Sequence, residues 1–291
     1  MASSQNQRNM KHNHLPRAKK SKKDEYYTLL EDIGWELVKY IPQLRSKVVY
    51  CNCDDEWSAF VYFFITYFHI IGLKKLYCTG IEGKLIEYDG HRTKKRKIDG
   101  DFRSADCREI LAKCDIVITN PPFSLFREWL EVIDGKDFLV IGNKNAVSFE
   151  TLFPMIQCGR VKLGYTIPRK FITDNGQITQ KVDRLCRWFT TLEVVKEATF
   201  KPTCHYDEKK YQRFDNYPAI NVDKVKDIPA DYDGFLGVPI TYFDKIDYNN
   251  YELVDRISRY SVMDKSIGIK GHQLTEINGK PKYSRLIIKK L

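Results

Sequence analysis

The feature that most limits the fold of this chain is an apolar run that ends abruptly at two prolines. The run Asp115-Ile116-Val117-Ile118-Thr119 is short and β-branched, which is typical of a strand buried on both faces of a sheet. Asn120-Pro121-Pro122-Phe123 follows it directly. Two consecutive prolines fix φ twice and remove two N–H donors, so the strand must end there. A strand of this kind favours an α/β fold.

The Asn-Pro-Pro-Phe loop (residues 120–123) is also unusual in its hydrogen-bonding groups. The amide oxygen of Asn120 and the carbonyl of Pro121 are acceptors with almost no competing donor, so they can hold one –NH2 group from two sides. Phe123 offers a flat apolar face for the ring that carries this amine. Holding both amine hydrogens turns the nitrogen lone pair toward an electrophile, which is chemistry by positioning and electrostatics. The loop predicts a site for an exocyclic amine on a planar heterocycle, and a turn with a core Phe is the structural alternative.

Strands and helices alternate along the first two thirds of the chain. Helical spacing joins Leu30, Ile33, Leu37 and Ile41. Helical spacing also predicts an amphipathic helix on apolar positions, namely Trp57, Phe60, Val61, Phe64, Ile65 and Phe68. Ser104 is expected to cap a helix, and further strands are predicted at 47–51, 76–79 and 138–141, with a basic-tipped hairpin at 85–99. This order implies a mostly parallel sheet that binds ligands at its carboxyl edge.

Composition excludes several classes of protein. Hydrophobic residues make up 43% of the 291 residues and aromatic residues 13%, which excludes a wholly disordered chain. No apolar run reaches 18 residues and no signal peptide is evident, so we expect no membrane span and a cytoplasmic protein. The eight cysteines are scattered and are expected to be reduced, with no metal site. The net charge is +10, and residues 1–23 hold seven Lys and Arg but no acid, which indicates a polyanion partner or a solubilising leader.

Several motifs in a fixed order resemble one family. The resemblance rests on Asp24-Glu25-Tyr26-Tyr27-Thr28, Val48-Val49-Tyr50-Cys51-Asn52-Cys53-Asp54-Asp55, Gly100-Asp101-Phe102-Arg103-Ser104, the Asn-Pro-Pro-Phe loop, Arg187-Trp188-Phe189-Thr190, Phe214-Asp215-Asn216-Tyr217 and Gly237-Val238-Pro239-Ile240-Thr241. The loop resembles the catalytic motif of amino-methyltransferases that use S-adenosylmethionine. From about Lys23 to the C-terminus, the chain resembles the EcoRI-type adenine-specific DNA methyltransferases.

The resemblance implies a domain organisation. We expect a Rossmann-like S-adenosylmethionine-dependent methyltransferase sheet with a smaller, irregular C-terminal recognition module. The expected boundaries are a disordered basic tail at 1–23, a catalytic domain at 24–195, and a target-recognition module at 196–291 that packs on the catalytic domain. Beyond about Val195, short strand-like runs broken by Tyr, Asp, Pro and Gly, with no long helix, agree with this division.

The resemblance also implies a cofactor site for S-adenosylmethionine across the edges of the first strands. The residues expected to bind it are Tyr27, Thr28, Asp54, Asp55, Asp101 and Phe102. Tyr27 and Thr28 would donate hydroxyl hydrogen bonds to its carboxylate. Either Asp54 or Asp55 would hold its ammonium. Asp101 would accept the adenine amino group, and Phe102 would lie against the adenine ring. The chain departs from many methyltransferases after the first strand, where Cys51-Asn52-Cys53-Asp54-Asp55 replaces a Gly-x-Gly turn that lets the backbone approach a ligand.

The implied substrate is an adenine in double-stranded DNA, which must be flipped out of the duplex before its amine can react. Phe123 is expected to stack on one face of the base, and Trp188 or Phe189 on the other. Alternate strand residues point to opposite faces, so one of that pair is expected in the core. We therefore predict an adenine-N6 DNA methyltransferase that acts as a monomer. A cognate restriction endonuclease in the same system is a candidate partner. The alternatives are an RNA, protein-glutamine or cytosine-N4 methyltransferase, or a DNA-binding protein that has lost the cofactor.

Overall fold

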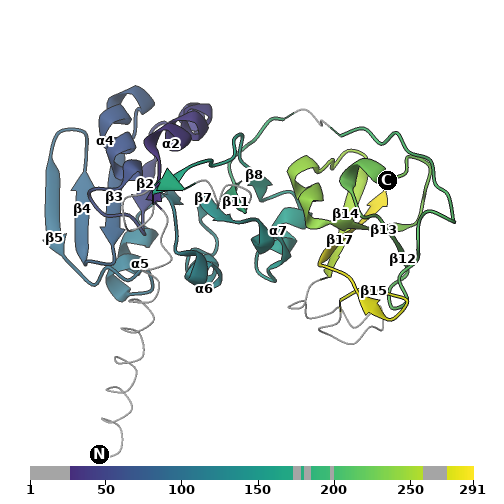
Figure 1. Ribbon diagram of the computed structural model, residues 1–291. Coiled ribbons are helices and arrows are strands. Elements are labelled where there is room, and N and C mark those ends of the chain that lie inside the picture. The colour runs from purple at the N-terminus through teal and green to yellow at the C-terminus, as the bar shows by residue number, and fades with distance from the viewer. Residues whose placement is uncertain (1–26, 173–177, 180–184, 197–199, 258–273) are drawn as a thin grey trace, which may run out of the picture. The chain divides into compact units, whose positions relative to one another are not determined.

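The computed structural model describes residues 27–172, 178–179, 185–196, 200–257 and 274–291, in two compact units (Figure 1). The first unit contains Lys162–Val194 and the chain up to Lys144, and the second contains Asn145–Val161 and Val195–Leu291. The expected basic tail at 1–23 lies outside the described residues. The second unit thus joins the segment 145–161 to the chain from Val195 onward.

An eight-stranded mixed sheet forms the centre of the first unit. Its strands are β2 (Val48–Cys51), β3 (Lys75–Gly80), β4 (Lys84–Tyr88), β5 (Thr93–Lys97), β6 (Ile116–Thr119), β7 (Asp137–Asn143), β8 (Lys162–Leu163) and β11 (Cys186–Thr190), in the spatial order β5-β4-β3-β2-β6-β7-β11-β8. The four central strands β3, β2, β6 and β7 are parallel, and the strands at both ends are antiparallel. This arrangement confirms the predicted Rossmann-like α/β fold.

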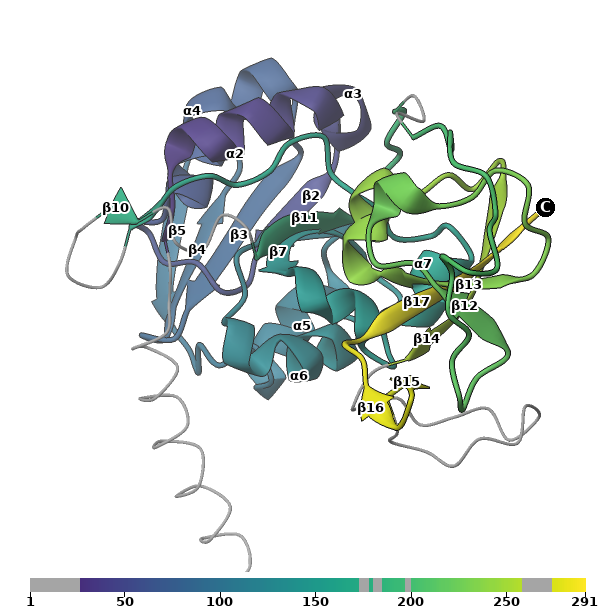
Figure 2. The same cartoon turned by 45° about the vertical axis from the view of Figure 1, so that its right-hand side comes forward.

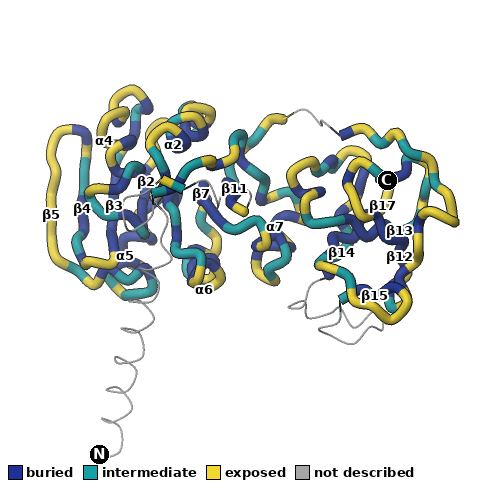
Figure 3. The backbone as a smooth tube through the Cα atoms, in the orientation of Figure 1, coloured by how far each residue is buried: buried dark blue, intermediate teal, exposed yellow. Residues whose placement is uncertain are grey.

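Helices cover both faces of this sheet. They are α2 (Leu30–Leu37), the 3-10 turn η2 (Val38–Tyr40), α3 (Ile41–Leu44), α4 (Ala59–Ile71), α5 (Ala105–Ala112), η3 (Phe123–Leu125) and α6 (Phe126–Val132). Figure 2 shows α2 and α4 on one face and α5 and α6 on the other. Burial follows this layering in Figure 3, because β2, β3 and β6 are almost wholly buried while every residue of β5 is exposed. The run before the two prolines is therefore buried on both faces, as predicted.

Three local predictions need correction. The helical spacing from Leu30 to Ile41 does not form one helix, because Pro42 lacks an N–H and its ring disfavours an α-turn over the residues before it. The helix predicted from Trp57 begins only at Ala59, since Ser58 is its N-cap, and this leaves Trp57 85% exposed. The hairpin forms over 84–97, but most of its cations, Lys94 to Lys97, lie along the edge strand β5, and Arg92 alone of that cluster lies in the turn.

A separate small sheet joins the start of the described chain to the first unit. Strand β1 (Tyr27–Thr28) pairs antiparallel with β9 (Phe171–Ile172), and β9 pairs with β10 (Ile178–Thr179). This pairing fixes Thr28 opposite Phe171.

The second unit is built on a four-stranded sheet in the order β12-β13-β17-β14. Its elements are β12 (Ala219–Asn221), β13 (Phe235–Pro239), β14 (Tyr251–Ile257) and β17 (Arg285–Lys290), with the hairpin β15 (Glu276–Ile277) and β16 (Lys280–Pro281), helix α7 (Phe153–Gln157) and the 3-10 turns η4 (Lys144–Ser148), η5 (Val225–Asp227) and η6 (Ile240–Lys245). The side-chain amide of Gln157 donates to the carbonyl of Leu253 at 2.9 Å, and Arg256 donates to the carbonyl of Ser148. These bonds explain why 145–161 clusters with a part of the chain that is distant in sequence.

The described residues contain neither a membrane-spanning helix nor a cluster of metal-binding side chains. No helix among them is long and apolar enough to cross a membrane. Within the same residues, no three His, Cys, Asp or Glu side chains lie close enough to hold a metal ion. The eight cysteines all lie in the described part of the chain, and none of them forms a disulfide.

Candidate active site

Two of the predicted site segments, the Asp54-Asp55 pair and the Asn-Pro-Pro-Phe loop, follow two neighbouring central strands. Strands β2 and β6 are parallel neighbours, so the loops that follow Cys51 and Thr119 leave the sheet at the same edge. From β2 the chain passes to β3 on one side, and later returns to β6 on the other side. This is the switch point at which open α/β sheets bind ligands.

Asp54 joins the two loops at this switch point. Its buried carboxylate accepts hydrogen bonds from Ser58 Oγ at 2.7 Å, from Thr119 Oγ1, and from the backbone N–H of Asn120. Burial raises the pKa of Asp54 to about 6, because loss of hydration outweighs the three hydrogen bonds that favour the charged form. Asp54 thus links the loop after β2, the start of α4 and the Asn-Pro-Pro-Phe loop.

Two further hydrogen bonds fasten the loop after β2. The backbone N–H of Cys53 donates to Thr119 Oγ1 at 3.2 Å. The buried Asn52 accepts from the indole Nε1 of Trp129 at 3.0 Å, and Trp129 lies on α6, the helix that follows the Asn-Pro-Pro-Phe loop. The loop after β2 is therefore bound both to the end of β6 and to the helix beyond it.

The Asn-Pro-Pro-Phe loop itself is only partly covered. Asn120 is half-buried, with its amide oxygen below the surface, and Pro121 is buried. Phe123 is half-buried at the start of η3 and packs against the main core. The loop thus combines a fixed backbone with a side-chain amide and an aromatic ring near the surface.

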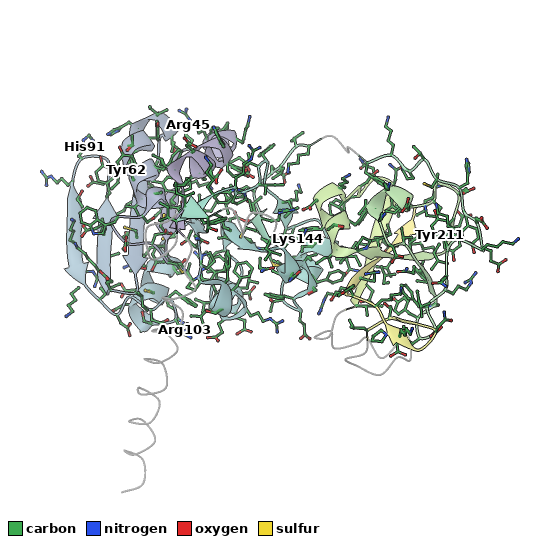
Figure 4. The ribbon with its side chains drawn as sticks, viewed as in Figure 1. Arg45, Tyr62, His91, Arg103, Lys144 and Tyr211 are labelled. Carbon is green, nitrogen blue, oxygen red and sulfur yellow. The ribbon has the colours of Figure 1, made fainter. Side chains whose placement is uncertain are left out.

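Arg103 organises the second predicted motif. Its Nε donates to Asp101 Oδ1 at 2.9 Å and its Nη2 to Asp101 Oδ2 at 2.6 Å, while Nη1 donates to Glu128 of α6 at 2.6 Å. The guanidinium carbon also lies 5.2 Å from the ring centroid of the buried Phe102. Arg103 is labelled near α5 in Figure 4. Sequence reasoning assigned no role to Arg103, although the Asp-Phe-Arg spacing was the signal for this ion pair.

Glycines from other loops bring backbones together beside the loop after β2. A Cβ on Gly100 would lie 2.0 Å from the carbonyl oxygen of Gly80, and a Cβ on Gly80 would lie 3.0 Å from Cβ of Asp55. Gly83, with φ +79°, would bring a Cβ to 2.6 Å from the carbonyl oxygen of Ile98. No glycine follows β2, but glycines at the end of the neighbouring strand β3 and in the loop before α5 let their backbones pack closely beside Asp55.

The remaining predicted cofactor residues differ in what they contact. The carboxylate of Asp55 accepts the backbone N–H of Trp57 at 2.9 Å. Thr28 is 5% exposed, and its hydroxyl forms no hydrogen bond within the described part of the chain. Tyr27 pairs with Ile172 in the small sheet.

A buried pair of carboxylates that sequence reasoning missed holds this small sheet in place. Glu36 on α2 is fully buried and accepts four hydrogen bonds, from the hydroxyl of Tyr40, the backbone N–H of Tyr165, and the backbone and hydroxyl of Thr166, at 2.6–2.7 Å. Asp32, one turn earlier, accepts the N–H groups of residues 169 and 170. Both carboxylates anchor the segment that leads into β9, the partner of β1. Two acids in an amphipathic helix read as solvated residues, so only the fold reveals them.

The two residues expected to face the base, Trp188 and Phe189, lie in the core of the first unit. Both are fully buried, on opposite faces of β11. Trp188 packs edge-on against Phe60 of α4 at 6.0 Å between centroids, and Phe189 packs near Phe126 of α6 at 6.2 Å. The expectation that one of the pair lies in the core holds for both.

Comparison with known proteins agrees with this geometry. The family described as "Adenine-specific methyltransferase EcoRI" matches residues 14–97 and 81–291. The Type II methyltransferase M.EcoRI of Escherichia coli is 37% identical over 97% of this chain and 98% of its own length. The Type II methyltransferase M.MpnI of Mycoplasma pneumoniae is 35% identical over 94% and 97%, and a Type II methyltransferase of Mycoplasma genitalium is 35% identical over 95% and 98%. No solved structure matches the chain.

Proposed function

Because this chain belongs to the family of EcoRI-type adenine-specific methyltransferases, and is therefore a DNA adenine methyltransferase, we propose that the reaction takes place at the switch point between β2 and β6. The observation that carries this proposal is the buried carboxylate of Asp54. It fixes the backbone of Asn120 against the loop where the cofactor is expected, so the amine-binding group and the methyl donor share one rigid frame.

Type II methyltransferases generally use S-adenosylmethionine, and the residues at this edge fit that molecule. It supplies an electrophilic methyl group on a sulfonium. The buried hydroxyl of Thr28 is proposed to donate a hydrogen bond to its carboxylate. A like role for Tyr27 stays a prediction from the sequence. Asp55 is better placed than Asp54 to hold the ammonium, because Asp54 already accepts three hydrogen bonds from the protein.

The same fit extends to the adenosyl part. Asp101 is proposed to accept the adenine amino group, with Phe102 beside the ring. Three donors of Arg103 hold the Asp101 carboxylate: Nε and the backbone N–H both donate to Oδ1 at 2.9 Å, and Nη2 donates to Oδ2 at 2.6 Å. Arg103 therefore acts as a positioning residue that holds this carboxylate against α6.

The transfer step follows from the groups of the Asn-Pro-Pro-Phe loop. We propose that Asn120 Oδ1 and the carbonyl of Pro121 accept the two amine hydrogens of a flipped adenine, and that Pro122 keeps this stretch free of a competing N–H donor. The grip would direct the nitrogen lone pair along the line to the methyl group, and the gain comes from alignment. The N–C bond would form as the C–S bond breaks, with S-adenosylhomocysteine as the leaving group and one amine proton passed to water. Phe123 stacks on the base, a contact worth roughly 1–3 kcal/mol.

The two units are proposed to have different roles. The first unit holds every residue assigned to the reaction, so a monomer is proposed to suffice. The second unit is proposed to recognise the DNA sequence. A cognate restriction endonuclease and a cytoplasmic location stay predictions from the sequence.

The test is an Asn120→Ala variant assayed in parallel for binding and for transfer. We expect methyl transfer to duplex DNA to fall below detection, while calorimetric binding of S-adenosylhomocysteine and of DNA stays within a fewfold of wild type. Ser124→Ala, an exposed substitution next to the loop, is the matched control and should keep full activity. Near wild-type transfer by Asn120→Ala would refute the mechanism, and a wild-type protein that binds no cofactor would support the rival of a DNA-binding protein without activity.

A further inference from the structure

Trp57 stands out because a large apolar side chain is exposed at the catalytic edge of the sheet. It is 85% exposed, whereas Trp35 on α2 is 52% exposed and the other two tryptophans are fully buried. A single exposed apolar residue is common on protein surfaces and needs no explanation by itself. Trp57 differs from such residues in its ordered backbone and in the contacts that join its loop to the loop of Asp101.

The backbone around Trp57 is fixed on both sides. Its own N–H donates to Asp55 Oδ1 at 2.9 Å. Glu56 forms ion pairs with Lys84 and Lys95 of the β4–β5 hairpin, and Ser58 caps α4 by accepting from the N–H of residue 60 at 3.1 Å. The indole is therefore held outside the protein by an ordered loop.

A short series of contacts leads from this loop to the predicted adenine position. Asp55 lies against Gly80, where an added Cβ would come within 3.0 Å of it. Gly80 in turn lies against Gly100, where an added Cβ would come within 2.0 Å of the carbonyl oxygen of Gly80. Asp101 follows Gly100 directly. The loop that bears Trp57 and the loop that bears Asp101 thus meet at one corner of the sheet, separated only by glycine backbone.

We propose that Trp57 is a cofactor contact, whose indole covers the adenosyl part of S-adenosylmethionine and shields it from water. This inference rests on the proposed function, since it takes the cofactor as the ligand of this corner. An aromatic face suits the planar, electron-poor purine ring, and stacking of this kind is sequence-independent and local. Because the indole is exposed without ligand, its contribution is to binding and not to folding.

The experiment measures the exposure of Trp57 directly. In a Trp35→Phe background, Trp57 is the one exposed tryptophan among the three that remain, and acrylamide quenching of its fluorescence reports its accessibility. Saturating S-adenosylhomocysteine should lower the quenching constant at least twofold. The matched variant Trp57→Phe should show weak quenching with and without the ligand.

Binding measurements give an independent readout. Trp57→Ala should weaken S-adenosylhomocysteine binding by roughly 5- to 150-fold, the range that corresponds to one stacking contact, with a smaller loss for Trp57→Tyr. The melting temperature should not change, because the side chain is exposed in the folded protein.

The outcomes separate this inference from the proposed function. Unchanged quenching and unchanged affinity in a wild-type protein that binds the ligand would overturn the role of Trp57 alone. Protection of Trp57 by duplex DNA without cofactor, and not by S-adenosylhomocysteine, would also overturn it and assign the indole to DNA. Absence of any ligand binding by wild type would remove the proposed function itself.

Discussion

Substitution of Asp54 by Asn should remove a pH dependence from the stability of the protein. Burial raises the pKa of Asp54 in the folded state to about 6, against an ordinary value of 3.8. A raised folded-state pKa means that the folded protein binds the proton more tightly, so stability is greatest below the ordinary value and is lost as the pH rises through 6. The full loss is about 3 kcal/mol, at about 1.4 kcal/mol for each pKa unit. About 2 kcal/mol of it falls between pH 4.5 and 7.5.

The assay is urea unfolding of wild type and Asp54→Asn at several pH values in this window. The difference in unfolding free energy between the two proteins should change by about 2 kcal/mol in favour of the variant as the pH rises. All other titrating groups are shared, so they cancel in this difference. Asp55→Asn leaves Asp54 in place and removes only a minor contribution to its raised pKa, so it should keep most of the wild-type dependence. Parallel curves for wild type and Asp54→Asn would show that Asp54 is not the buried link described above.

Three further substitutions test other contacts. Phe123→Ala should weaken retention of a flipped base by roughly 1–3 kcal/mol while Phe123→Tyr keeps activity, measured with a fluorescent adenine analogue at the target position; equal emission for both variants would argue against stacking. Asp101→Ala should weaken binding of S-adenosylhomocysteine by about 1.5–3 kcal/mol in calorimetry, and an unchanged affinity in the folded variant would move the adenine elsewhere. Glu36→Ala leaves one buried and three partly buried donors without their acceptor and should lower the unfolding free energy by at least about 3 kcal/mol in urea, so a loss below 1 kcal/mol would contradict the anchoring role of α2.

Local patterns predicted much of the fold because they depend on neighbours in sequence. The buried β-branched strand before Asn120 and the Ser104 cap, which accepts the N–H of Cys107 at 3.1 Å, both appear in the structure. The failures also have local causes. Periodicity alone placed Trp57 inside a helix, whereas the capping hydroxyl of Ser58 starts that helix after it.

The site was harder to predict, because its contacts join residues that are far apart in sequence. Asp54 and Thr119 are 65 positions apart, and nothing local shows that this aspartate serves the catalytic loop while its neighbour Asp55 does not. The glycines that bring backbones together lie at 80 and 100, and not after the first strand where the motif was sought. Trp188 was read from a motif, and only the packing of β11 against α4 shows that it is a core residue.

The most direct test of the central claim is the identity of the methylated nucleoside. The purified full-length chain is incubated with S-adenosylmethionine and duplex DNA, and the DNA is then digested to nucleosides and analysed by mass spectrometry. We predict N6-methyladenine with the wild-type chain and none with Asn120→Ala. N4-methylcytosine as the product, or no methylated nucleoside from a preparation that binds the cofactor, would contradict the account.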